Sequence, residues 1–372
     1  MTTKNPLKQL ESFGQSIWLD YIRRDLISSG ELARLIEEDG LRGMTSNPAI
    51  FEKAIVDSDD YDSEISAMVK DGQDATAIYE ALSQEDVRSA ADVFRPLYDS
   101  SKGGDGYVSL EVNPHLAHDT EGTVAEARRL WAALDRPNVF IKVPATRNGL
   151  AAIRQIISDG INVNVTLIFG VPRYREVVEA FIAGLEDRAA QGKPIDHIAS
   201  VASFFISRID ALVDPMLEKH IAAGGPQGDE AKKAHGEVAI SSGKVAFALY
   251  KDIFGSDRFK KLAEQGAQTQ RLLWASTSTK NPAFKDVKYV EALIGPHTVN
   301  TAPMETIEAY RDHGEPADRL EAGLDAAQEV MGGLPQLDID IDAVTQQLED
   351  EGVDKFNTPF DKLMDALADQ AT

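Results

Sequence analysis

The stretch "INVNVTLIF", residues 161–169, alternates apolar and polar side chains along most of its length. Successive side chains of a β-strand point to opposite faces, so every second residue shares a face. The apolar face of this stretch holds Val163, Val165 and Leu167, and the polar face holds Asn162, Asn164 and Thr166. We therefore predict a strand that packs one face against an apolar layer and turns the other toward a polar space.

Short apolar runs of this kind recur along the chain, and longer amphipathic helical patterns separate them. We predict eight strands, at residues 16–22, 40–46, 106–112, 138–144, 161–169, 197–206, 271–277 and 298–302. Strand and helix in alternation indicate a parallel sheet of the α/β class, and eight such units that close on themselves form a (β/α)8 TIM barrel. The alternative is a doubly wound open sheet, which usually has fewer strands and a glycine-rich first turn. The sequence has neither a G-x-G-x-x-G motif nor a Walker lysine loop.

Two regions exceed the length of a minimal barrel. Residues 53–105 carry helical patterns, and we predict that they form a helical insertion. Residues 303–372 are predicted to form C-terminal helices that pack on the outside of the barrel. We expect residues 1–372 to form a single domain, because 372 residues are enough for one large α/β domain.

The composition is that of an ordinary globular protein, with 43% hydrophobic and 27% charged residues. The formal net charge of −23 repels phosphate backbones and anionic lipids, so neither nucleic acid nor a membrane is an expected partner. An anionic substrate therefore needs a local basic pocket. The sequence has no cysteine, no apolar signal core at its start and no run of 18 apolar residues, which leads us to expect a soluble cytoplasmic protein.

Polar residues of the predicted strands gather at one end of the barrel. Strand side chains alternate between the interior and the helix layer, and the outer face must be apolar, so the polar residues point inward. The inward set consists of Asp20, Glu111, Lys142, Asn164 and Thr166, each toward the carboxyl end of its strand, where barrel enzymes keep their active sites. Two other interpretations stay open. A strand lysine is often solvated at an edge, and Lys142 with Glu111 and Asp20 can form a buried ion-pair network with no chemistry attached.

Lys142, in the apolar run "NVFIKVPAT" (138–146), suggests a specific chemistry. Burial disfavours the ammonium form, and a neutral amine attacks carbonyl groups to form a Schiff base. Neighbouring carboxylates favour the charged form, so the protonation state stays open at this point. Cleavage of a carbon–carbon bond near the imine requires groups that move protons, and Asp20 and Glu111 suit that role. Because asparagine and serine side chains suit hydroxyl-rich ligands, we expect a Schiff-base enzyme that acts on a carbonyl sugar.

Five motifs, in this order, resemble those of the transaldolase family. They are "MTSNPAIF" (44–51), "VSLEVNP" (108–114), "IKVPAT" (141–146), "NVNVTLIF" (162–169) and "WASTSTKNP" (274–282). The resemblance covers residues 15–303 and is strongest to the larger bacterial members. It implies a (β/α)8 barrel that needs no cofactor and no metal. It also implies transfer of a dihydroxyacetone unit from sedoheptulose 7-phosphate to glyceraldehyde 3-phosphate, which gives erythrose 4-phosphate and fructose 6-phosphate in the non-oxidative pentose phosphate pathway. The sequence leaves open whether the protein is a monomer or a homodimer.

The resemblance also implies roles for individual residues. Lys142 corresponds to the Schiff-base lysine, and Asp20 to the acid and base that handles the C4 hydroxyl proton. Glu111 corresponds to the carboxylate that works through a water held by Thr166 during imine formation. The expected substrate-binding residues are Asn47, Asn164 and Ser203 for the dihydroxyacetone unit, and Arg208, Ser276 and Lys280 for the phosphate.

The loop "ASTSTKN", residues 275–281, departs from the family pattern, because Lys280 stands in place of an arginine. Lysine neutralises a phosphate but cannot make the bidentate contact of arginine. Two alternatives to a transaldolase stay open. One is a Schiff-base aldolase that releases free dihydroxyacetone, and the other is a catalytically silent barrel used for binding. The joint presence of Lys142, Asp20, Glu111 and Thr166 argues against the silent barrel.

Two patterns resemble metal sites. The stretch "DIDIDAVTQQLE" (338–349) has the spacing of a calcium loop, but Ala343 stands where the turn requires glycine, and Asp342 is better explained as a helix N-cap. His115 and His118 also have a metal-like spacing. The sequence shows no evident third ligand for them, and the start of a surface helix explains them better. We therefore predict no metal site.

Overall fold

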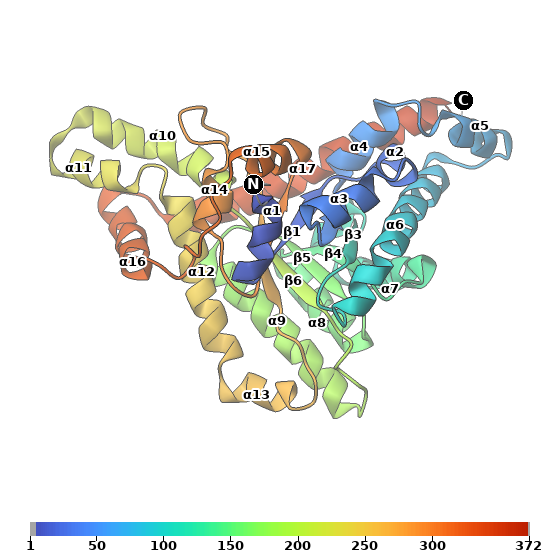
Figure 1. The fold of residues 1–372 in the computed structure, drawn as a ribbon, viewed down its shortest axis with the longest axis horizontal. Coiled ribbons are helices and arrows are strands. Elements are labelled where there is room, and N and C mark those ends of the chain that lie inside the picture. The colour runs from blue at the N-terminus through green and yellow to red at the C-terminus, as the bar shows by residue number, and fades with distance from the viewer. Residues whose placement is uncertain (1–4, 371–372) are drawn as a thin grey trace.

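A computed structural model describes residues 5–370 and shows a closed barrel of eight parallel strands with helices around it (Figure 1). The strands are β1 (Gln15–Asp20), β2 (Gly43–Thr45), β3 (Tyr107–Glu111), β4 (Val139–Pro144), β5 (Val163–Ile168), β6 (Ser200–Phe205), β7 (Arg271–Ala275) and β8 (Thr298–Ala302). They pair in sequence order, and β8 pairs with β1 to close the barrel. The predicted (β/α)8 barrel is confirmed, and the open doubly wound sheet is excluded. Most predicted strands were too long by a few residues at their ends.

Helices connect the strands and surround the barrel (Figure 1). They are α1 (Pro6–Gln9), α2 (Arg24–Ser28), α3 (Glu31–Asp39), α4 (Pro48–Val56), α5 (Asp62–Lys70), α6 (Ala75–Ser100), α7 (Thr120–Leu134), α8 (Arg147–Asp159), α9 (Val171–Ala190), α10 (Ser207–Ala223), α11 (Gly225–Ala234), α12 (Val238–Phe254), α13 (Asp257–Ala263), α14 (Lys288–Ala292), α15 (Met304–His313), α16 (Leu324–Gly333) and α17 (Ile341–Gln370). The 3-10 helices are η1 (Leu10–Phe13), η2 (Pro114–His118) and η3 (Leu334–Leu337). The predicted insertion thus contains the last four residues of α4 and all of α5 and α6, and the C-terminal region contains α15 to α17.

The strand register places the candidate site residues at one level. In the β3–β4 pair Glu111 stands beside Lys142, and in the β4–β5 pair Lys142 stands beside Asn164. The register shifts between Val165 and Ile168 in the β5–β6 pair, where Leu167 has a positive φ of 61°. The strict alternation predicted through Leu167 therefore breaks near the carboxyl end of β5, because a local irregularity changes the direction of the side chain.

Aromatic rings fill the barrel interior below this level. The ring centroid of Phe140 lies 4.3 Å from that of Tyr107 and 6.1 Å from that of Trp18. Gly43 of β2 lies directly against Trp18, since a Cβ atom at that position would come within 2.5 Å of the indole. The interior is therefore a packed core, and the site above it has a rigid floor.

A carboxylate network ties the amino-terminal end of the barrel together. The Asp105 carboxylate accepts hydrogen bonds from Arg42 Nε at 2.7 Å, Arg271 Nη1 at 3.2 Å and Ser16 Oγ at 2.9 Å. Asp105 is buried and precedes β3, whereas Arg42 precedes β2 and Arg271 begins β7. One anion thus joins segments that are far apart in the sequence, at the end of the barrel opposite the candidate site.

We expect Asp105→Ala to lower the free energy of unfolding by about 3–5 kcal/mol, because it leaves Arg42 and Arg271 largely buried without their shared anion. Urea unfolding measures this loss. The control is Asp99→Ala, which removes an exposed partner of Arg95 and should cost less than about 1 kcal/mol. Equal losses in the two variants would show that the network does not stabilise the barrel.

The long helix α17 crosses the carboxyl end of the barrel. It packs against α4, α6 and α10 and contacts β5, and Figure 1 shows it beside α4. Asp340 caps its start, because the Asp340 carboxylate accepts hydrogen bonds from the backbone amides of Asp342 and Ala343, both at 3.1 Å. The prediction that Asp342 is the N-cap is therefore wrong by two residues.

Within residues 5–370, no helix is long and apolar enough to cross a membrane.

Candidate active site

A cavity of about 260 Å³ opens at the carboxyl end of the barrel. The predicted site residues that line it are Asp20, Asn47, Lys142, Thr166, Ser203, Arg208, Ser276 and Lys280. Glu111 and Asn164 adjoin the cavity through their contacts with Lys142 and Ser203. The structure thus brings together every site residue that the sequence predicted, from five strands (β1, β3, β4, β5 and β6) and from the segments that follow β2, β6 and β7.

Lys142 of β4 is buried and paired. Its side chain is 5% exposed, and its Nζ donates hydrogen bonds to Glu111 Oε2 at 3.2 Å and to the Ser46 carbonyl at 3.0 Å. The Phe356 ring of α17 covers it, with the ring centroid 5.2 Å from Nζ. The interpretation of Lys142 as a solvated edge lysine is therefore wrong. The Lys142 amine is held between a carboxylate, a carbonyl and an aromatic face.

Glu111 of β3 is a carboxyl group that titrates near neutrality. Burial raises its pKa to about 7, although the neighbouring Lys142 charge acts in the opposite direction. Glu111 Oε1 has no hydrogen-bond partner within residues 5–370. Glu111 also borders a second cavity of about 30 Å³ beside Tyr79 and Asn113, which is enough room for one water molecule. The group is suited to exchange protons with water at physiological pH.

The raised pKa of Glu111 predicts a pH-dependent stability. The pKa of an unfolded glutamate is near 4.5, so the folded protein binds the Glu111 proton more tightly than the unfolded chain does. The stability that this proton contributes is fully present below about pH 4.5 and is lost as the pH rises through about 7. We expect the stability of Glu111→Gln relative to the native protein to rise by on the order of 2 kcal/mol between pH 5 and pH 8. Urea unfolding at several pH values measures the difference. The exposed Glu264→Gln is the control and should show a constant difference.

Asp20 stands at the carboxyl end of β1 and lines the same cavity as Lys142. Burial raises its pKa, while the Lys142 charge and a hydrogen bond from the Thr45 hydroxyl at 2.7 Å lower it. Thr45 Oγ1 also lies 2.7 Å from Thr301 Oγ1, which fixes the position of the hydroxyl. Asp20 is thus a positioned carboxyl group in the same cavity as the amine, with a pKa that burial raises above that of a solvated aspartate.

Amides and hydroxyls line the cavity or adjoin it. Asn164 is fully buried, donates to Ser109 Oγ at 3.1 Å and accepts from Ser203 Oγ at 2.7 Å. The Asn47 side-chain oxygen accepts from the Ile50 amide at 3.0 Å and caps α4, which orients the rest of the Asn47 amide toward the cavity that it lines. The Thr166 hydroxyl is buried and has no hydrogen-bond partner within the described chain. These groups are suited to bind a ligand with several hydroxyls.

Cationic side chains, Arg208 and Lys280, also line the cavity. Burial lowers the pKa of Arg208, and burial together with the Arg208 charge lowers the pKa of Lys280. Lys280 Nζ donates to Ser278 Oγ at 2.7 Å, and Ser276 Oγ lies 3.1 Å from Ser207 Oγ. Two cations that repel each other inside an acidic protein form a favourable site for a dianion.

Sequence reasoning missed several residues of this cavity. Ser46 acts through its backbone carbonyl, for which the side chain gives no signal. Thr45 and Thr301 point inward from β2 and β8, and strand alternation applied to those two strands would have found them. Lys355 and Phe356 line the cavity from α17, more than 200 residues after Lys142 along the chain, so no local pattern indicated them.

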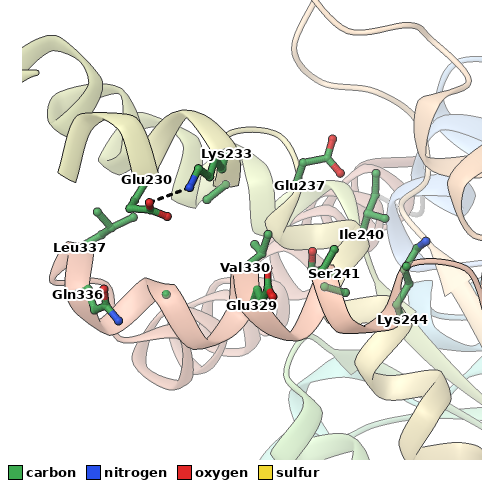
Figure 2. A pocket seen from close by; sticks show the side chains of 15 residues that line it. Glu230, Lys233, Glu237, Ile240, Ser241, Lys244, Glu329, Val330, Gln336 and Leu337 are labelled. Atoms are coloured by element: carbon green, nitrogen blue, oxygen red, sulfur yellow. Dashed lines mark hydrogen bonds and ion pairs between the residues drawn. The ribbon is translucent and has the colours of Figure 1, made fainter. Parts of the chain in front are cut away.

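A cavity of about 470 Å³ lies between α11, α12 and α16 (Figure 2). In Figure 2, Lys233 pairs with Glu230, and Lys244 lies at the other end of the groove. Lys244 Nζ donates to the Arg319 carbonyl at 2.9 Å, so its amine is already engaged. This groove has more room than the barrel cavity, but its lysines already have partners, since Lys233 pairs with Glu230 within α11 and Lys244 binds backbone carbonyls. We therefore place the chemistry in the barrel.

The two metal-like patterns have structural roles. His115 Nε2 lies 2.6 Å from Asp361 Oδ1, and this contact joins η2 to α17. Glu349, the last residue of the calcium-like stretch, is buried and pairs with Arg173 Nε at 2.9 Å. Among the residues that the structure describes, no group of three histidines or carboxylates could hold a metal ion.

Comparison with known proteins gives full-length similarities. A family model described as Transaldolase/Fructose-6-phosphate aldolase matches residues 17–367. A protein of Trichodesmium erythraeum (strain IMS101), named Transaldolase, is 49% identical over 370 residues, which are 98% of this chain and 97% of that protein. Transaldolase 2 of Nostoc sp. (strain PCC 7120) is 50% identical over 368 residues, with 98% of this chain and 97% of that protein covered. Transaldolase of Saccharopolyspora erythraea is 45% identical over 371 residues, with 100% and 99% covered.

Proposed function

The chain belongs to the transaldolase/fructose-6-phosphate aldolase family, and from that membership we propose how its barrel cavity performs the reaction. The protein is a transaldolase, which transfers a three-carbon ketone unit between sugar phosphates through a Schiff base. The observation that carries the assignment of residues is the buried Lys142 amine, 3.2 Å from Glu111 and in the same cavity as Asp20.

The reaction begins with attack of the Lys142 amine on the C2 carbonyl of a ketose phosphate. Glu111 moves protons through a water bound by the Thr166 hydroxyl, and the carbinolamine loses water to give a protonated imine. The unpartnered Thr166 hydroxyl and Glu111 Oε1, both buried, support this role, because each has hydrogen-bonding capacity left for a water.

Cleavage of the carbon–carbon bond requires a base at the C4 hydroxyl. Asp20 accepts that proton, the C3–C4 bond breaks, and its electron pair moves into the imine to give an enamine on Lys142. The aldehyde leaves and an acceptor aldehyde takes its place. The enamine attacks the acceptor carbonyl, Asp20 returns the proton, and hydrolysis of the imine releases the new ketose and restores the lysine.

Substrate binding divides between two sets of side chains in and around the cavity. Asn47, Asn164 and Ser203 bind the hydroxyls of the dihydroxyacetone unit, and Arg208, Ser276 and Lys280 bind the phosphate. We propose sedoheptulose 7-phosphate and glyceraldehyde 3-phosphate as substrates, in the non-oxidative pentose phosphate pathway. Action in the cytoplasm, as a monomer or a homodimer without nucleic acid or membrane partners, stays a prediction.

The experiment that separates transfer from simple cleavage uses fructose 6-phosphate as donor. With donor alone, a transaldolase should release little free dihydroxyacetone, and addition of erythrose 4-phosphate should give sedoheptulose 7-phosphate at a much higher rate. Rapid release of dihydroxyacetone that an acceptor does not suppress would instead identify an aldolase. Absence of both products would indicate a silent barrel.

A further inference from the structure

We propose that Lys355 of α17 is a third cationic contact for the substrate phosphate, and that Glu351 competes with the phosphate for it. This inference rests on the function proposed for the barrel cavity. It assigns a specificity role to the C-terminal helix, which joins the substrate site from outside the barrel.

The position of Lys355 in the cavity is the first argument. Lys355 lines the cavity together with Arg208 and Lys280, the two residues already assigned to the phosphate. Arg208 lies at the start of α10 and Lys280 lies between β7 and β8, so Lys355 approaches from a third element. The next residue, Phe356, is buried over Lys142 and fixes this turn of α17 at the cavity.

The charges around Lys355 are the second argument. Lys355 Nζ donates to Glu351 Oε2 at 2.9 Å, one helical turn away. Glu351 also interacts with Arg208. The Glu351 charge acts to raise the pKa of Arg208, and the Arg208 charge acts to lower the pKa of Glu351, as expected for an attractive pair. One carboxylate thus faces two of the cations that line the cavity. A phosphate dianion carries more charge than this carboxylate and can displace it from both.

The exposure of the pair makes that displacement easy. The side chains of Lys355 and Glu351 are 50% and 40% exposed, so their ion pair is weak and either side chain can reorient at little cost. The presence of a lysine at position 280 gives a reason for the extra contact. An arginine offers two parallel hydrogen bonds to a phosphate, whereas a lysine offers a point charge, and a second lysine restores part of the lost interaction.

The test compares Lys355→Ala with Lys362→Ala, an exposed lysine on the same helix that does not line the cavity. With glyceraldehyde 3-phosphate as acceptor at low ionic strength, Lys355→Ala should raise KM about 5- to 10-fold and change kcat less than about 2-fold. With unphosphorylated glyceraldehyde, neither constant should change. Lys355→Arg should restore most of the affinity. Lys362→Ala should match the native protein with both acceptors.

The Glu351→Gln variant tests the competition and predicts the opposite sign. It should lower the inhibition constant of inorganic phosphate about 2- to 3-fold, because Lys355 and Arg208 lose the carboxylate that competes with the anion. Lys355→Ala should raise the same constant. Equal effects of Lys355→Ala on both acceptors, or an unchanged inhibition constant in both variants, would overturn the inference. A native protein that forms no borohydride-trapped adduct on Lys142 would instead overturn the proposed function.

Discussion

Lys142→Met is expected to abolish the covalent adduct with fructose 6-phosphate and to reduce turnover by about 10⁴-fold or more, because no other side chain replaces the nucleophile. Methionine keeps the aliphatic stem that packs against Phe356 and removes only the amine. Borohydride reduction followed by peptide mass spectrometry locates the adduct. In the native protein the added mass should lie on the peptide that contains Lys142.

The controls for this experiment separate nucleophilicity from charge. Lys142→Arg keeps a cation beside Glu111, at a position where Lys142 Nζ lies 3.2 Å from the carboxylate, yet guanidinium does not form an imine. It should be as inactive as Lys142→Met. Lys362→Met removes an exposed lysine and should keep both the adduct and the activity. An adduct that persists in Lys142→Met would show that another amine is the nucleophile.

Asp20→Asn is expected to lower kcat by about 10²- to 10⁴-fold while the imine still forms, because the amide cannot accept the C4 hydroxyl proton. The substitution is isosteric, and the hydrogen bond from the Thr45 hydroxyl to Asp20 can be kept by the amide oxygen. Borohydride trapping measures imine formation, and release of the aldehyde in a single turnover measures bond cleavage. The two measurements should separate in this variant.

A different pattern is expected for Glu111→Gln. Glu111 acts during imine formation in the proposed mechanism, so this variant should form the trapped adduct slowly and should not accumulate it. An Asp20→Asn variant that also fails to form the adduct would contradict the assigned division of roles. So would an Asp20→Asn variant that cleaves the carbon–carbon bond at the native rate.

The sequence predicted the eight strands and the direction of their polar faces because both follow from short-range rules. Alternation along a strand has a period of two residues, and the apolar outer face leaves only the interior for polar side chains. Lys142, Asp20 and Thr166 lie in one cavity for this reason, and Glu111 meets Lys142 through the strand register. The alternation of side chains predicted for β5 fails near Leu167, where the register shifts and the backbone has a positive φ.

The residues that the sequence did not indicate act over long separations or through the backbone. The Ser46 carbonyl accepts from Lys142, although a carbonyl is present at every position of the chain. Asp340 caps α17 instead of Asp342, because the helix begins two residues earlier than predicted. Both positions hold an aspartate, so the residue type alone does not decide where the helix begins.

The sequence by itself determined the class of fold and the inward direction of Lys142, Asp20 and Glu111, since burial and strand periodicity act within each segment. Only the tertiary structure decided which side chains close the cavity. Helix α17 brings Phe356 over Lys142 and places Lys355 with Arg208 in one cavity, and these contacts exist because the helix packs against α4, α6 and α10. The physical reason is that helix packing depends on the shapes of surfaces assembled from distant segments, whereas alternation depends only on neighbours along the chain.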